Sequence, residues 1–124
     1  LHGGGASIRS FIHIDDVSEA TLKIAEDGVV GETYHISTDR MISIKDLVTL
    51  ICEKMNVDFN EHIDVVDERP GKDTAYSLDS TKLRETLHWI DKITLEDGLD
   101  EVIDWIDENL EEIKKQQFDY IHKQ

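Results

Sequence analysis

Apolar residues recur at helical spacing in several parts of this chain. Between residues 44 and 55 they fall at spacings of 3, 4, 7, 8 and 11, which marks one face of a helix. Ser43, followed by Asp46, has the form of a capping box at its start. Thr94 precedes a second stripe, made of Leu95, Leu99, Val102, Ile103, Ile106, Leu110 and Ile113. The pattern therefore predicts helices that begin after Ser43 and Thr94.

Two further helices are predicted from weaker signals. Asp15 or Asp16 can cap a helix that ends near Gly28. Another helix is expected from about Ser80, burying Leu83 and Leu87. Both carry apolar residues on one face, which is the pattern of a helix packed on a core.

Short apolar or β-branched runs between these helices predict strands. They cover residues 9–14, 31–37, 62–66 and 74–79. The sequence 68–73 holds the single proline, Pro70, and predicts a loop. Short strands alternating with amphipathic helices over 124 residues indicate one unit of the α/β or α+β class, and α/β is the class expected.

The composition excludes several classes of partner and location. Thirteen Lys and Arg against 28 Asp and Glu give a net charge of −15, which argues against nucleic acid or an anionic membrane as a partner. Apolar runs fall well short of the roughly 20 residues that a membrane helix needs. The lone Cys52 excludes an internal disulfide and fits a reducing compartment, so a cytoplasmic location is expected.

Metal binding and nucleophilic catalysis find little support. The six histidines are never spaced by three or four residues, and Cys52 has no second cysteine to form a zinc motif. Cys52 also lies on the apolar stripe of its helix, where a thiol usually acts as a small buried hydrophobe. We therefore expect no metal site and no catalytic residue in this chain.

Acidic residues are concentrated in 96–112, which holds nine of them and no Lys or Arg. The simpler interpretation is a solvated face opposite the apolar stripe. The alternative is a non-catalytic α/β interaction module whose acidic helix docks on a basic partner.

Three of the scarce cations occupy positions that suit an anion. Arg9 lies in a predicted strand, and Arg69 and Lys72 flank Pro70 in the loop. The guanidinium group presents paired donors that match phosphate oxygens, so a diphosphate is one candidate ligand. Ordinary surface salt bridges are the other interpretation, and composition by itself favours them.

The order of the motifs resembles extended short-chain dehydrogenases of the NAD-dependent epimerase/dehydratase family, which act on nucleotide sugars. Within it, the segment Glu68–Asp79 (ERPGKDTAYSLD) is similar to the D-R-P-G-H-D-x-R-Y-x-[IL]-D motif of the dTDP-glucose 4,6-dehydratase branch. The other matching segments are Leu1–Val17 (L-x-G-x-G with R-S-F-I-H-I-D-D-V), Gly31–Ile36 (GETYHI), Ser80–Trp89 and Thr94–Leu99 with Trp105.

The resemblance implies that this chain is the carboxyl-terminal, substrate-binding portion of such an enzyme. Arg9 and Arg69 match the two family arginines that grip the nucleotide diphosphate, and Lys72, Asp73 and Tyr76 are implied nearby. Two positions depart from the family pattern, since Ser10 replaces an Asp and Lys72 replaces a His. The partner implied is therefore a nucleotide-diphosphate sugar.

The family's cofactor loop and catalytic motif are not found in the sequence. Gly28 and Gly31 begin a G-x-x-G-x-x-G pattern, but Tyr34 occupies its third position. No tyrosine is followed four residues later by lysine. We therefore expect NAD to be bound by an amino-terminal Rossmann domain absent from this chain, and the chain alone to be inactive.

Apolar surface left without that domain predicts self-association. A 4-epimerase of the same family is the alternative to a dehydratase.

Overall fold

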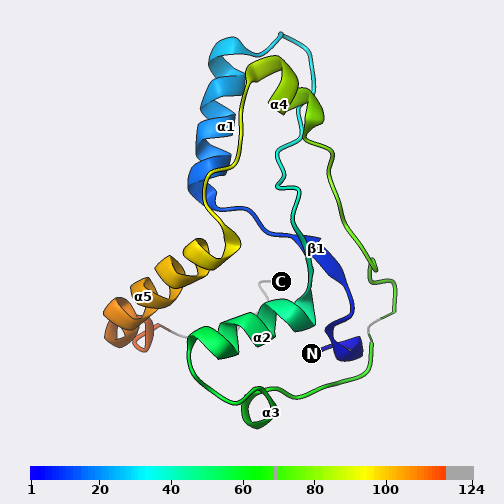
Figure 1. The fold of residues 1–124 in the computed structure, drawn as a ribbon. Helices are drawn as coiled ribbons and strands as arrows, with labels where there is room; N and C mark the ends of the chain where they lie inside the picture. The colour runs from blue at the N-terminus through cyan, green and yellow to red at the C-terminus, as the bar shows by residue number, and fades with distance from the viewer. Residues whose placement is uncertain (69, 117–124) are drawn as a thin grey trace, which may run out of the picture.

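The computed structural model describes residues 1–68 and 70–116 (Figure 1). Two short strands alternate with helices, so the expected α/β class is confirmed. In chain order the elements are the 3-10 turn η1 (Gly3–Gly5), β1 (Ile8–Ser10), α1 (Ile14–Asp27), β2 (Met41–Ser43), α2 (Ile44–Lys54), α3 (Phe59–His62), α4 (Thr81–Leu87) and α5 (Leu95–Ile113).

The predicted capping box at Ser43 is confirmed, and the helix predicted after Thr94 starts with the same arrangement. The Ser43 hydroxyl accepts a hydrogen bond from the Asp46 amide at 3.0 Å and donates to its carboxylate at 2.7 Å, which starts α2. At the start of α5, Thr94 makes the equivalent pair with Asp97, at 3.1 and 2.6 Å. Each box satisfies an amide that the first turn leaves without a partner.

The first helix begins two to three residues earlier than predicted. Its cap is His13, whose Nδ1 accepts from the Asp15 amide at 3.2 Å, rather than Asp15 or Asp16. The other ring nitrogen, Nε2, lies 3.3 Å from the Glu101 carboxylate on α5. His13 therefore joins the start of α1 to α5.

The segments that pair as β-strands are much shorter than the strands predicted from the sequence. β1 pairs with β2 in antiparallel register, with Arg9 opposite Ile42, and covers only part of 9–14. On its other side β1 meets 74–79 in a single parallel bridge, between Ile8 and Ala75. Of the expected strand 9–14 only residues 9 and 10 thus lie in β1, and of 74–79 only Ala75 forms a bridge.

Two predicted strands are absent among the described residues. The segment 31–37 does not pair with a neighbouring strand. Its Ser37 carbonyl accepts hydrogen bonds from the Ser80 hydroxyl at 3.0 Å and from the Arg84 guanidinium at 2.9 Å instead. The region 62–66 begins inside α3, which Asp58 starts by accepting from the Asn60 amide at 2.7 Å. Of that region only Val66 forms a bridge, with His2.

The core lies where α1 packs against α4 (Figure 1). Its buried residues are Ala20, Leu83, Leu87 and Trp89, and Ile12, Ile24, Tyr34 and Ile36 pack around them. The expected burial of Leu83 and Leu87 is confirmed. By contrast, none of the residues of α5 is buried, and Figure 1 shows this helix extending away from α1 and α4.

Candidate functional site

Arg9 lies beside the loop that the sequence links to the same ligand. Its Nη1 donates to the Ile8 carbonyl at 2.7 Å, and its Nη2 donates to the Asp73 carbonyl at 2.9 Å. The backbone follows the same course, because the Ile8 amide donates to the Thr74 carbonyl at 2.9 Å and the Tyr76 amide donates to the Ile8 carbonyl at 3.3 Å. The structure thus brings Arg9 next to the segment of Asp73 and Tyr76, which lies more than 60 residues later in the sequence.

Lys72 is held within this loop. Its ammonium lies 3.2 Å from the Glu68 carboxylate, and its side chain is 17% exposed. The Glu68 carboxylate also lies close against Gly3. Gly3 has a φ of +54°, a conformation that favours glycine there.

Tyr76 is 56% exposed and so is not part of the core. Arg69, the second arginine singled out from the sequence, lies outside the described residues. Arg9, Lys72, Asp73 and Tyr76 therefore form the described part of the candidate site, on β1 and the 70–76 segment.

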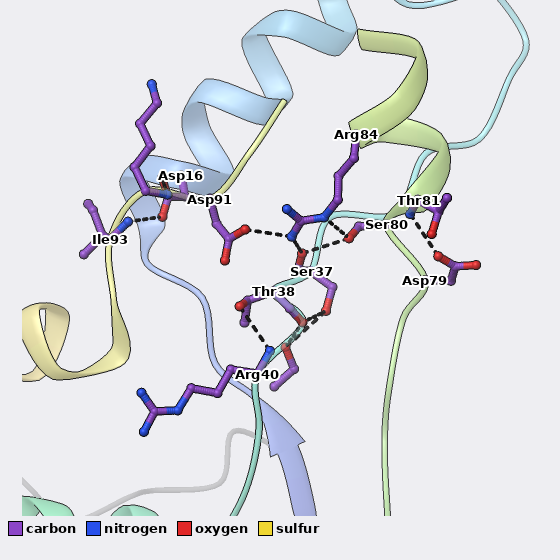
Figure 2. Close-up of polar contacts among 12 residues, drawn as sticks. Asp16, Ser37, Thr38, Arg40, Asp79, Ser80, Thr81, Arg84, Asp91 and Ile93 are labelled. Carbon is purple, nitrogen blue, oxygen red and sulfur yellow. Dashed lines mark hydrogen bonds and ion pairs between the residues drawn. The ribbon is translucent and has the colours of Figure 1, made fainter. Parts of the chain in front are cut away.

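A second polar cluster was missed from the sequence (Figure 2). Arg84 on α4 donates to the Ser80 hydroxyl, the Ser37 carbonyl and the Asp91 carboxylate, at 2.9, 2.9 and 2.7 Å. Its guanidinium lies over the ring of Trp89, 5.0 Å from the centroid, and Trp89 is 1% exposed. Arg84 therefore ties three separate segments together.

The charge of Asp91 is stabilised by the same cluster. Burial acts to raise the pKa of Asp91, but hydrogen bonds from Thr38 and Arg84 outweigh it and hold this pKa below its usual value. The cluster is internally paired, so its role is to anchor the segment 37–40 to α4.

A cavity of about 220 Å³ lies next to this cluster. Its lining includes Thr38, Asp91 and Thr94, together with Arg40 and Glu96, which form an ion pair. That pairing raises the pKa of Arg40 and lowers the pKa of Glu96. The other two charged residues of the lining are paired as well, Asp91 with Arg84 and Lys92 with Glu19, so the charges of this cavity are matched within the chain.

The part of the chain that the structure describes holds neither a metal-binding group of side chains nor a helix that could span a membrane. Among residues 1–68 and 70–116, no group of three or more His, Cys, Asp or Glu side chains could hold a metal ion. No helix in the same ranges has the length and apolar character to span a bilayer.

The chain resembles known proteins over most of its length. A family model described as GDP-mannose 4,6 dehydratase matches residues 1–102. The trifunctional UDP-glucose 4,6-dehydratase/UDP-4-keto-6-deoxy-D-glucose 3,5-epimerase/UDP-4-keto-L-rhamnose-reductase of Arabidopsis thaliana is 37% identical over 111 residues, covering 90% of this chain and 16% of that protein.

Solved structures of nucleotide-sugar enzymes are also similar to this chain. The dTDP-glucose 4,6-dehydratase DesIV of Streptomyces venezuelae, with NAD and TYD bound, is 29% identical at a TM-score of 0.83, covering 88% of this chain and 34% of that one. The UDP-glucose 4-epimerase of Thermotoga maritima, with UDP-glucose, is 30% identical at a TM-score of 0.81, covering 89% and 35%.

The chain belongs to the NAD-dependent epimerase/dehydratase family and is dTDP-glucose 4,6-dehydratase-like. It spans about a third of the length of these solved relatives, or 34% and 35%.

Gly28 and Gly31 are the residues of this chain to compare with a glycine-rich NAD-binding loop. A dinucleotide pyrophosphate binds at a helix N-terminus approached through glycines. Here Gly28 caps the C-terminal end of α1, where its amide donates to the Ile24 carbonyl at 2.9 Å, and Gly31 follows that end. These glycines do not fit the cofactor, because a helix C-terminus presents carbonyl groups rather than amides.

Proposed function

We propose that this chain is the carboxyl-terminal, substrate-binding part of an NAD-dependent nucleotide-sugar 4,6-dehydratase. The full-length protein that contains it is called the parent protein below. The observation that carries the proposal is the hydrogen bond from Arg9 to the Asp73 carbonyl, which joins the two motifs implied to grip a nucleotide diphosphate. Activity, substrate and cytoplasmic location of the parent protein are part of this proposal.

Arg9 is proposed to bind phosphate through the donors that remain on its guanidinium group. Each terminal nitrogen carries two N–H groups, and one on each is directed at a backbone carbonyl. Those two bonds hold the planar group in place, so that little side-chain freedom is lost when an anion binds.

The neighbouring residues complete the proposed grip. Arg69 and Lys72 are proposed to add donors to the diphosphate, with Lys72 leaving its ion pair with Glu68 when the anion binds. The half-exposed Tyr76 ring is proposed to offer a flat surface to the nucleotide. Asp73 contributes its backbone carbonyl to Arg9.

The remaining chemistry is assigned to other parts of the parent protein. A 4,6-dehydratase oxidises the hexose at C4 with NAD, eliminates water across C5 and C6, and returns the hydride. The present chain lacks the Y-x-x-x-K motif and the glycine-rich loop for those steps. Its proposed contribution is to hold the diphosphate, which positions the sugar for a reaction elsewhere.

Product analysis tests the activity. The parent protein is incubated with dTDP-glucose and NAD, and the sugar is identified by mass spectrometry. Loss of one water, giving a 4-keto-6-deoxy sugar, is the expected result, whereas the chain 1–124 alone should give none. Dehydration by that chain, or an unchanged substrate with the parent protein, would contradict the proposal.

A 4-epimerase is the second candidate, favoured by the similarity to the UDP-glucose 4-epimerase structure. The same diphosphate grip serves either reaction. Incubation with UDP-glucose separates them, because an epimerase inverts C4 without loss of mass.

A further inference from the structure

Glu68 and Lys72 form an ion pair in the loop of the candidate site. The Lys72 ammonium lies 3.2 Å from a Glu68 carboxylate oxygen. The two partners differ in exposure, since the Lys72 side chain is 17% exposed and the Glu68 side chain is 46% exposed. The surface therefore presents the carboxylate to solvent more than the ammonium, and an approaching anion meets the negative member of the pair.

The loop places this ion pair next to Arg9. Asp73 directly follows Lys72, and its carbonyl accepts a hydrogen bond from the Arg9 guanidinium at 2.9 Å. Within residues 1–68 and 70–116, the donors of Arg9 are directed at the Ile8 and Asp73 carbonyls and at no carboxylate. Arg9 and Lys72 therefore differ in that part of the chain, because Lys72 carries an internal counter-ion and Arg9 does not.

A phosphate group can take the place of the Glu68 carboxylate at Lys72. Both groups offer anionic oxygens that accept hydrogen bonds from an ammonium group. Lysine is protonated at pH 7, whereas the histidine that the family pattern has at this position is mostly neutral at that pH. The lysine of this chain thus brings a full positive charge, which Glu68 balances while no ligand is bound.

We propose that Glu68 is an internal counter-ion that competes with the nucleotide diphosphate for Lys72. One phosphate group binds to Arg9 without disturbing the ion pair, and the second binds to Lys72 once Glu68 moves away. Glu68 thereby weakens the binding of a diphosphate more than the binding of a monophosphate. This inference rests on the proposed function, because it takes the diphosphate grip at Arg9 as given.

Titration of the parent protein with dTDP and with dTMP tests this role. Glu68→Gln keeps the shape of the side chain and removes its charge. The Kd for dTDP should then fall about three- to fivefold, toward the upper end of what a partly exposed ion pair is worth. The Kd for dTMP should stay within about 1.5-fold of the wild-type value, because its single phosphate is held at Arg9.

Two further variants separate the ion pair from a general effect of charge. Asp67→Asn removes the same charge from the exposed neighbouring residue and should lower the Kd for dTDP by less than about 1.5-fold. Lys72→Met removes the group for which Glu68 competes. In that background, Glu68→Gln should leave the Kd for dTDP within about 1.5-fold.

An unchanged Kd for dTDP in Glu68→Gln would overturn the inference. Equal decreases in Glu68→Gln and Asp67→Asn, or an undiminished effect of Glu68→Gln beside Lys72→Met, would also overturn it. If Glu68→Gln strengthens binding through Lys72 while Arg9→Ala has no effect, the counter-ion role is supported and the grip at Arg9 is wrong. If Arg9→Ala weakens binding while Glu68→Gln has no effect, only the counter-ion role is wrong. A parent protein that binds neither nucleotide would contradict both.

Discussion

Asp16 holds Ile93 in place across the molecule. One carboxylate oxygen of Asp16 accepts from the Ile93 amide and the other from the Lys92 amide, each at 3.0 Å (Figure 2). Asp16 is 2% exposed, and a buried carboxylate is tolerated only when its oxygens are hydrogen-bonded. This contact fixes the segment before α5 against the start of α1.

Replacement of Asp16 should therefore be costly. Asp16→Ala removes two charge-assisted hydrogen bonds and leaves two amides without partners, so we expect a loss of about 2–4 kcal/mol in the free energy of unfolding. Chemical denaturation of the parent protein measures it. Glu26→Ala, at an exposed acidic position on the same helix, should change the free energy of unfolding by less than about 0.5 kcal/mol. Equal effects of the two variants would contradict the role of Asp16.

The Arg84 cluster predicts a difference between two Arg→Lys exchanges. Lysine cannot reproduce three directed hydrogen bonds and the stacking on Trp89, so Arg84→Lys should cost about 1–3 kcal/mol. Arg40→Lys changes an exposed ion pair with Glu96 and should cost less than about 1 kcal/mol. Urea denaturation curves of both variants give the comparison. A cost at Arg40 that equals or exceeds the cost at Arg84 would argue against the cluster as an anchor.

Asp91 predicts a pH dependence of stability. Its pKa in the folded state lies below the ordinary value of 3.8, so its ionised form is stabilised by folding. That contribution is complete well above pH 3.8 and is lost as the pH falls through the folded-state pKa.

The comparison of wild type with Asp91→Asn isolates this effect. Wild type should be the more stable at pH 6, and its advantage should shrink as the pH is lowered from about 4 toward 3. Free energies of unfolding across that range provide the measurement. An advantage that stays constant or grows toward low pH would show that Asp91 is not the group responsible.

Helix positions could be predicted because their signals are local. Ser43 with Asp46, and Thr94 with Asp97, act within three residues of each other, so sequence spacing alone determines the geometry. The family motifs likewise pointed to Arg9 and Asp73, and the structure places the Arg9 side chain on the Asp73 carbonyl.

Strand pairing and the Arg84 cluster depend on distant residues. The segment 31–37 has strand-forming residues, yet the Ser37 carbonyl bonds to side chains from 80 and 84. Likewise, only Ser80 lies one helical turn from Arg84, whereas Ser37 and Asp91 lie in other segments, and no spacing rule relates these two to Arg84. Such contacts follow from the fold and cannot be derived from local pattern.

The diphosphate grip is the central claim, and a dTDP titration of the parent protein tests it most directly. Arg9→Ala removes charge-assisted hydrogen bonds worth roughly 1.5–3 kcal/mol, so the Kd should rise about ten- to a hundredfold. Arg69→Ala should weaken binding similarly, and Arg9→Lys nearly as much if the contact is bidentate. Lys23→Ala, which removes a cation paired with Asp27 on α1, should leave the Kd unchanged. If Arg9→Ala binds dTDP as tightly as Lys23→Ala does, the diphosphate is held elsewhere and the site assignment is wrong.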